Sequence, residues 1–183
     1  MKSNIDLVDM QTIDPRIIID LRYATINNFT TKVIYSFCHC YLLRKVAYAL
    51  KDVQDELESM NLGLKIWDGY RPLSAQKLLW NILPDERYIA NPLKGGKHTR
   101  GTAVDLTIVD NNKKELAMPS NFDEFNEKAH RYYKGVSKEK IKNRELLLEV
   151  MEKHGFIGLE TEWWHFDYKD WDKCLPMDII PQL

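Results

Sequence analysis

The chain has 183 residues, of which 44% are hydrophobic and 29% charged, and its formal net charge is -1. This length suits one domain over residues 1–183 whose core needs no disulfides, and the balanced charge excludes the basic surface of a nucleic-acid-binding protein. Neither a secretory signal nor a membrane span of roughly twenty apolar residues is visible. Unless a leader has been removed, we expect a cytoplasmic protein with a small-molecule partner, as a monomer or a homo-oligomer.

The residue pattern of the first half predicts two strands and two helices. β-Branched residues favour a strand over 17–23, and apolar residues at helical spacing predict a helix over 42–60 that ends near Asn61. Residues 64–70 alternate as in a strand, and a helix follows over 74–83.

The second half begins with a loop over 84–97, and a strand over 102–109 and a helix over 137–153 are expected after it. The remaining expected strands are a hairpin partner at 113–116 and two last strands at 156–159 and 163–168. Helices and strands do not alternate regularly, so we expect an α+β fold with a central antiparallel β-sheet flanked by helices.

The three cysteines, Cys38, Cys40 and Cys174, lack the even number and spacing of a disulfide framework, which favours a reducing compartment. In a strand, Cys38 and Cys40 would point opposite to His39. We therefore interpret them as small hydrophobic residues rather than as a metal clip.

Two short segments some sixty residues apart contain metal-binding residue types. His98 precedes Gly101, which permits a tight turn, and Asp105 follows on a strand, so both side chains can face one ion. His165 arrives from a distant strand. Two imidazoles and one carboxylate can hold zinc and leave a fourth position for water, as in catalytic sites. Each residue alone is weak evidence, but together they predict one Zn2+.

Glu162, three residues before His165, is the candidate general base for that water. On a straight strand these two side chains would point to opposite faces, so the strand must begin or bend near Trp163. Burial beside Trp163 and Trp164 would raise the pKa of the carboxyl group toward neutrality.

Arg71, at the exit of the 64–70 strand, is placed to stabilise an oxyanion, and Asp68 could orient it. Simpler interpretations remain: Arg71 paired with a surface acid, a solvated Glu162, and tryptophans that only fill the core.

The motifs together resemble a known family. His-x-x-Gly-x-Ala-x-Asp with Glu-x-Trp-His is similar to the zinc DD-peptidases related to the Hedgehog fold. More narrowly, the chain resembles the VanX-type D-alanyl-D-alanine dipeptidases, and the segments that carry this resemblance are 20–25, 28–29, 67–72, 101–107, 122–123 and 162–165.

The resemblance implies a Hedgehog-like domain in which zinc is held by His98, Asp105 and His165. It also implies that Glu162 is the catalytic base and that Arg71 stabilises the tetrahedral intermediate.

For the substrate, the resemblance implies a dipeptide whose ammonium group meets Asp123, with further contacts from Tyr23, Asp68 and Trp163. An equally weighted alternative for Asp123 is an acid at the N-terminus of a helix over 124–131.

One departure from the family is Gly96, because a serine usually stands two residues before the first histidine. Lys97 could meet the carboxylate end of the substrate instead.

We therefore expect hydrolysis of D-alanyl-D-alanine to two D-alanines by zinc-bound water. One alternative is a DD-carboxypeptidase or peptidoglycan endopeptidase that acts on longer peptides. Another is a zinc-stabilised binding module without catalysis, which Glu162 and Arg71 argue against. Vancomycin resistance, D-alanine salvage and cell-wall turnover would all use this chemistry.

Overall fold

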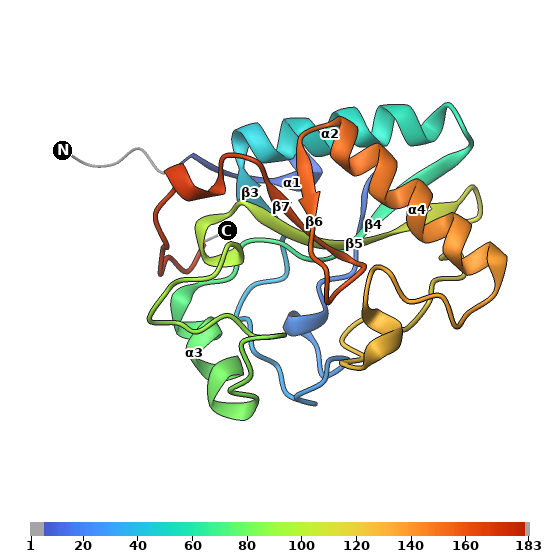
Figure 1. The fold of residues 1–183 in the computed structure, drawn as a ribbon. Helices are drawn as coiled ribbons and strands as arrows, with labels where there is room; N and C mark the ends of the chain where they lie inside the picture. The colour runs from blue at the N-terminus through green and yellow to red at the C-terminus, as the bar shows by residue number, and fades with distance from the viewer. Residues whose placement is uncertain (1–5, 182–183) are drawn as a thin grey trace.

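The computed structural model describes residues 6–181 and is built around a five-stranded sheet (Figure 1). The strand order is β2 (Ile18–Ile19), β4 (Leu62–Asp68), β5 (Ala103–Asp110), β7 (His165–Tyr168) and β6 (Phe156–Gly158). A second, two-stranded antiparallel sheet joins β1 (Leu7–Asp9) to β3 (Tyr41–Leu43).

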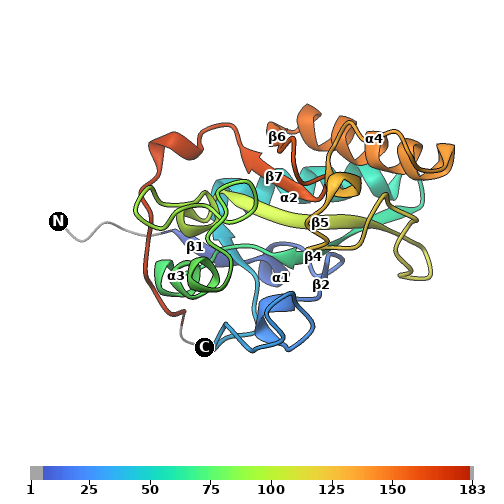
Figure 2. The same cartoon turned by 60° about the horizontal axis from the view of Figure 1, so that its bottom comes forward.

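Two long helices, α2 (Arg44–Glu58) and α4 (Lys138–Lys153), lie side by side over one face of the five-stranded sheet in both views (Figures 1 and 2). The shorter α3 (Leu73–Ile82) and the long connecting loops lie on the other side, and α1 (Met10–Ile13) follows β1. The 3-10 turns are η1 (Arg22–Ala24), η2 (His98–Arg100), η3 (Glu127–Ala129) and η4 (Trp171–Lys173).

The predicted helices over 42–60 and 137–153 are confirmed, and local signals explain their ends. Asn61 has a φ of 59°, in the left-handed region that reverses the chain after α2. The Ser137 side chain caps α4 by accepting a hydrogen bond from the amide of Lys140. Apolar residues on the inner faces of both helices then join one core.

Strand β5 is buried along nearly its whole length, so both of its faces are covered. Val104, Leu106 and Ile108 belong to the hydrophobic core, as the alternation of the sequence predicted. Asp105 lies on the opposite face, among the side chains of the functional site described below.

Three expectations need correction. The sheet is mixed rather than wholly antiparallel, because β2 runs parallel to β4. The strand expected over 17–23 covers only Ile18–Ile19, since the chain turns into η1 and places Tyr23 in the core. The hairpin expected at 113–116 is reduced to a single bridge between Val109 and Glu115.

The Cys38-His39-Cys40 segment precedes β3 and is not part of a strand. Cys40 is buried, whereas Cys38 is exposed. Among the described residues, no helix has the length and apolar character needed to cross a membrane.

The register of three neighbouring strands positions the site. Asp105 on β5 pairs with Asp68 on β4 at one side and with His165 on β7 at the other. Residues that pair directly across strands project to the same face of the sheet. A register shift between Ile66 and Asp68 interrupts the β4–β5 pairing just before Asp68, an irregularity of the kind found beside active sites.

Candidate metal and catalytic site

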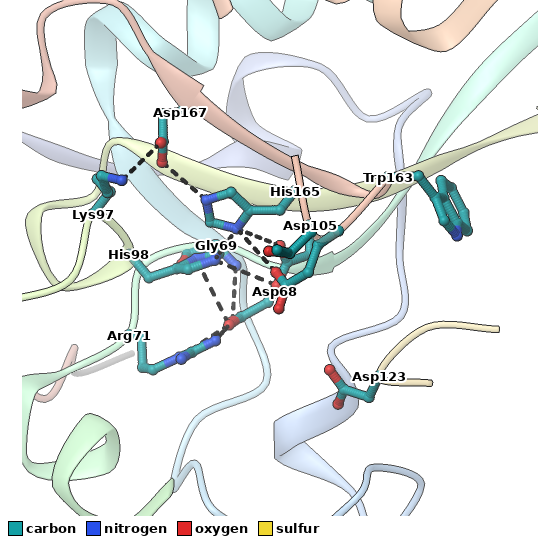
Figure 3. A network of polar contacts seen from close by, with 12 residues as sticks. Asp68, Gly69, Arg71, Lys97, His98, Asp105, Asp123, Trp163, His165 and Asp167 are labelled. Atoms are coloured by element: carbon teal, nitrogen blue, oxygen red, sulfur yellow. Dashed lines mark hydrogen bonds and ion pairs between the residues drawn. The ribbon is translucent and has the colours of Figure 1, made fainter. Parts of the chain in front are cut away.

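His98, Asp105 and His165 converge, with one ligand atom from each lying within 4.8 Å of the others (Figure 3). His98 lies in η2, and Gly101, with a φ of 67°, turns the chain from η2 toward β5 and Asp105. His165 is the first residue of β7. The adjacent segments η2 and β5 therefore meet β7, which lies some sixty residues later in the chain, as predicted.

The distances among these atoms suit one small cation. His98 Nε2 lies 3.2 Å from His165 Nδ1 and 3.3 Å from Asp105 Oδ2, and His165 Nδ1 lies 2.9 Å from Asp105 Oδ1. All three side chains are buried. Two imidazole nitrogens and a carboxylate are a donor set that zinc prefers, so the residues present fit this ion.

The outward ring nitrogen of each histidine is also bound, which fixes the ring orientation. His98 Nδ1 donates to the carbonyl oxygen of Gly69 at 2.8 Å, and His165 Nε2 donates to Asp167 Oδ1 at 2.9 Å. The other Asp167 oxygen lies 3.1 Å from Lys97 Nζ. Such outer partners orient the rings and leave the inner nitrogens for a metal.

The electrostatics of His165 follow from these neighbours. Burial lowers the pKa of its imidazole, but the carboxylates of Asp167 and Asp105 outweigh that effect and raise the pKa to about 10. Burial alone would raise the pKa of Asp105, yet the two histidines hold it below its ordinary value. A metal that binds here would displace a proton.

Glu162 lies in the turn before β7, and its Oε2 is 3.9 Å from His165 Nδ1. The amide of His165 donates to the carbonyl oxygen of Glu162, so the strand begins after the turn, which is the bend that the sequence required. Burial raises the pKa of the Glu162 carboxyl group well above its ordinary value, and the charges of Asp105 and Asp123 add to the effect.

Arg71 is buried, and four side chains hold its guanidinium in place. Asp68 Oδ2 accepts from Nη2 at 2.6 Å, Gln76 Oε1 accepts from Nη1 at 2.9 Å, and the Tyr35 hydroxyl accepts from Nε at 3.3 Å. The guanidinium lies over the Tyr23 ring, with Arg71 Cζ 5.1 Å from the ring centroid. Asp68 is fully buried behind Arg71, so it orients the arginine and does not form part of the cleft wall.

A cavity of about 130 Å³ opens beside the cluster. The lining includes all three metal-ligand candidates and residues of the 84–97 loop, together with Tyr23, Arg71, Asp123, Glu162 and Trp164. Tyr88 of this loop stacks on Phe125, with ring centroids 4.8 Å apart, and Gln76 Nε2 donates to the carbonyl oxygen of Ala90 at 2.7 Å. The loop therefore forms one wall of the cleft.

Asp123 lines the cavity and points its carboxylate toward the cluster (Figure 3). The Tyr23 hydroxyl donates to it at 3.0 Å. Burial, aided by the charge of Asp105, raises the pKa of Asp123 to about 8. The alternative of a helix over 124–131 is wrong, because only η3 forms there and Asn126 caps it.

The structure does not bring Trp163 to the cleft. Its indole nitrogen donates to the Ser120 hydroxyl at 3.0 Å, and the ring points away from the cluster (Figure 3). The adjacent Trp164 lines the cavity instead, with the two ring planes 86° apart. Lys97 also reaches the cavity, but its ammonium group pairs with Asp167.

Sequence reasoning missed three partners of the site. Asp167 had a usable signal, because it lies two residues after His165 and therefore on the same strand face. Tyr35 and Gln76 had none, because their contacts with Arg71 arise only when separate segments pack together.

Comparison with known proteins places the chain in a family. Residues 3–178 match the peptidase M15 family described as D-ala-D-ala dipeptidase. The chain is 39% identical over 167 residues to a D-alanyl-D-alanine dipeptidase of Escherichia coli (strain K12), which covers 91% of this chain and 86% of the relative. A D-alanyl-D-alanine dipeptidase of Enterococcus faecalis (strain ATCC 700802 / V583) is 36% identical over 172 residues, covering 82% and 85%.

Among solved structures, the LdcB LD-carboxypeptidase shares the fold, with a TM-score of 0.50 at 20% identity, over 92% of this chain and 73% of that chain. The chain therefore belongs to the D-ala-D-ala dipeptidase family of M15 metallopeptidases, as the sequence motifs predicted.

Proposed function

We propose that this protein is a zinc-dependent dipeptidase that hydrolyses D-alanyl-D-alanine to two D-alanines. The observation that carries the proposal is the convergence of His98, Asp105 and His165 within 4.8 Å, next to the buried carboxyl group of Glu162. The substrate is the one named for the relatives at 39% and 36% identity.

Zinc supplies Lewis-acid chemistry, since it lowers the pKa of water and polarises a carbonyl group. Glu162 accepts the proton of the attacking water and then passes it to the departing amine, a role that its raised pKa suits. The Arg71 guanidinium faces the same cavity and stabilises the negative charge that develops on the carbonyl oxygen.

The length of the substrate is limited at the part of the cavity that Asp123 lines. The Asp123 carboxylate, held by the Tyr23 hydroxyl, pairs with the free ammonium group of the dipeptide. A blocked amino terminus would leave this buried carboxylate with the Tyr23 hydroxyl but without a cationic partner, and that penalty discriminates against longer peptides. The 84–97 loop lies close to Asp123 in the chain fold, because its Tyr88 stacks on Phe125, two residues after Asp123.

The test compares Glu162→Gln with Glu160→Gln, an exposed acid two residues away. We expect Glu162→Gln to keep its zinc, measured by elemental analysis, and to lose about 10²–10⁴-fold in kcat for D-alanyl-D-alanine, measured by amine release. His165→Ala should lose both zinc and activity. Full turnover by Glu162→Gln would eliminate the proposed base.

The substrate itself is tested by offering the dipeptide beside an N-acylated tripeptide that ends in D-alanyl-D-alanine. We expect cleavage of the dipeptide alone. If only the blocked tripeptide is cleaved, the substrate assignment is wrong although the metal assignment stands.

A further inference from the structure

Arg131 is one of the largest fully buried side chains, and its hydrogen-bond acceptors all belong to a single loop. Its Nε donates to the carbonyl oxygen of Leu159 at 3.1 Å. Its Nη2 lies 3.4 Å, 3.0 Å and 3.3 Å from the carbonyl oxygens of Glu162, Trp163 and His165. One guanidinium thus donates hydrogen bonds to four carbonyl groups of the 159–165 loop.

The backbone of Ala129 and of Arg131 itself strengthens the attachment. The amide of Arg131 donates to the carbonyl oxygen of Glu160, and the amide of Trp163 donates to the carbonyl oxygen of Ala129, both at 2.9 Å. The Phe166 ring lies 4.8 Å below the guanidinium. The loop held in this way carries Glu162 and His165, which are the proposed base and one proposed metal ligand.

An arginine that only filled the core would be expected to have an acid partner, because an uncompensated buried charge is costly. Arg144 meets that expectation: it is equally buried, pairs with Glu145 at 2.8 Å and donates to the carbonyl oxygen of Tyr133. Among the ion pairs of residues 6–181, none involves Arg131. Burial, together with the charge of Arg144, lowers the pKa of Arg131 to about 10, which leaves it cationic at neutral pH.

We propose that Arg131 is a positioning residue that fixes the 159–165 loop, so that the Glu162 carboxyl group and His165 Nδ1 keep their places at the zinc site. The inference rests on the proposed function, because it assigns roles to those two residues. It predicts that disturbing this guanidinium changes zinc binding and turnover, although Arg131 touches neither the cavity nor the metal ligands' side chains.

Gly158 offers a second way to disturb the guanidinium without removing it. A Cβ atom at this position would lie 2.6 Å from both Cζ and Nε of Arg131. Gly158 lies on β6 and has no positive φ, so alanine suits its backbone. Gly158→Ala therefore displaces Arg131 while every hydrogen-bonding group of the wild-type protein is retained.

The experiment uses the full chain and four variants: Arg131→Met, Arg131→Lys, Gly158→Ala and the control Arg144→Met. Zinc affinity is measured by competition with a chromophoric chelator, and hydrogen–deuterium exchange is followed at the amides of 159–165. We expect Arg131→Met and Gly158→Ala to weaken zinc binding about 10–100-fold, the range known for groups that orient metal ligands. The same loop amides should exchange faster.

Turnover separates positioning from general stability. Asp123 and Tyr23 lie on other segments, so kcat should fall at least about tenfold while KM for the dipeptide stays within about twofold. Arg131→Lys retains a cation, so its zinc affinity and its kcat should lie between those of wild type and those of Arg131→Met. Arg144→Met should lose thermal stability without a change in zinc affinity.

The proposal is overturned if Arg131→Met and Gly158→Ala bind zinc as tightly as Arg144→Met and exchange their loop amides at its rates. Should Arg131→Met fail to fold, Gly158→Ala and Arg131→Lys decide by the same criterion. Zinc affinity and hydrogen–deuterium exchange can both be measured on a protein that cleaves no substrate. A wild-type protein that binds zinc but leaves D-alanyl-D-alanine intact would therefore refute the proposed function and leave this comparison valid.

Discussion

Asp123 is a carboxyl group whose charge depends on pH in the neutral range. Burial, with the charge of Asp105, raises its pKa to about 8, so in the free protein it is mostly protonated at pH 6. A neutral carboxyl group attracts an ammonium group less than a carboxylate does. KM for the dipeptide should therefore fall as the pH rises from 6 to 7.5, below the pKa of a peptide amino terminus, about 8.

Asp123→Asn should show a higher KM without this pH dependence, and steady-state kinetics at several pH values would measure it.

Asp123 also makes the stability of the fold depend on pH. The direction of this dependence is opposite to that caused by an ion-paired acid, whose pKa is lowered on folding. Between the ordinary pKa of 3.8 and about 8, the folded state binds a proton that the unfolded state lacks, so this group makes stability fall as the pH rises. Asp123→Asn should melt above wild type at pH 8, with a smaller difference at pH 5. Equal differences at both pH values would contradict the raised pKa.

The residues of the site were predictable to the extent that their chemistry is local. The proposed ligand set His98, Asp105 and His165 followed from residue types and spacing, and the structure brings the three together. Trp163 and Trp164 could not be told apart, since which of two consecutive indoles faces the cleft depends on how the turn before β7 packs.

At the scale of elements, the turn between η2 and β5 sets the distance between two of the proposed ligands, His98 and Asp105. Gly101 has a φ of 67°, and a Cβ there would lie 3.0 Å from Leu7 Cδ2 and 3.3 Å from Leu43 N. This left-handed backbone conformation alone would make the folded state with alanine about 1–2 kcal/mol less stable. Gly101→Ala should therefore lower stability and also weaken zinc binding, because His98 and Asp105 flank the turn.

Gly155 provides the matched control, since its φ is 88° and the atoms nearest to its Cβ would belong to the flexible Lys169 side chain, at 3.3–3.4 Å. Gly155→Ala should lose a similar amount of stability in denaturant unfolding and keep its zinc affinity. If both variants bind zinc as wild type does, the turn at Gly101 does not govern the ligand geometry.

The same distinction between local and distant causes explains which elements were predictable. The ends of α2 and α4 depend on Asn61 and Ser137, which act within one turn of the chain. The parallel pairing of β2 with β4 and the role of the 84–97 loop as a cleft wall depend on distant segments. No periodicity within either segment encodes those contacts.

For the whole molecule, the proposed metal site joins the adjacent elements η2 and β5 to β7, which lies some sixty residues later in the chain. His98, Asp105 and His165 come from η2, β5 and β7, while the core beneath them is apolar and continuous. The sheet and the α2 and α4 layer are thus held by burial that needs no ion, in contrast to small zinc domains that unfold without metal. Zinc should add to the stability of a fold that exists without it.

Chelation therefore tests the site through the stability of the entire protein. A ligand that binds only the folded state stabilises it by about 4 kcal/mol when its free concentration is a thousand times Kd. For a chain of this size, each kcal/mol shifts Tm by about 2–4 °C, so removing zinc should lower Tm by roughly 10 °C with one cooperative transition.

Two variants control this measurement. His165→Ala should melt at the same temperature with and without chelator. His154→Ala, which removes a distant histidine paired with Glu56, should respond as wild type does. A wild-type Tm unchanged by chelation would mean that these three side chains hold no metal, because differential binding and stabilisation are thermodynamically inseparable.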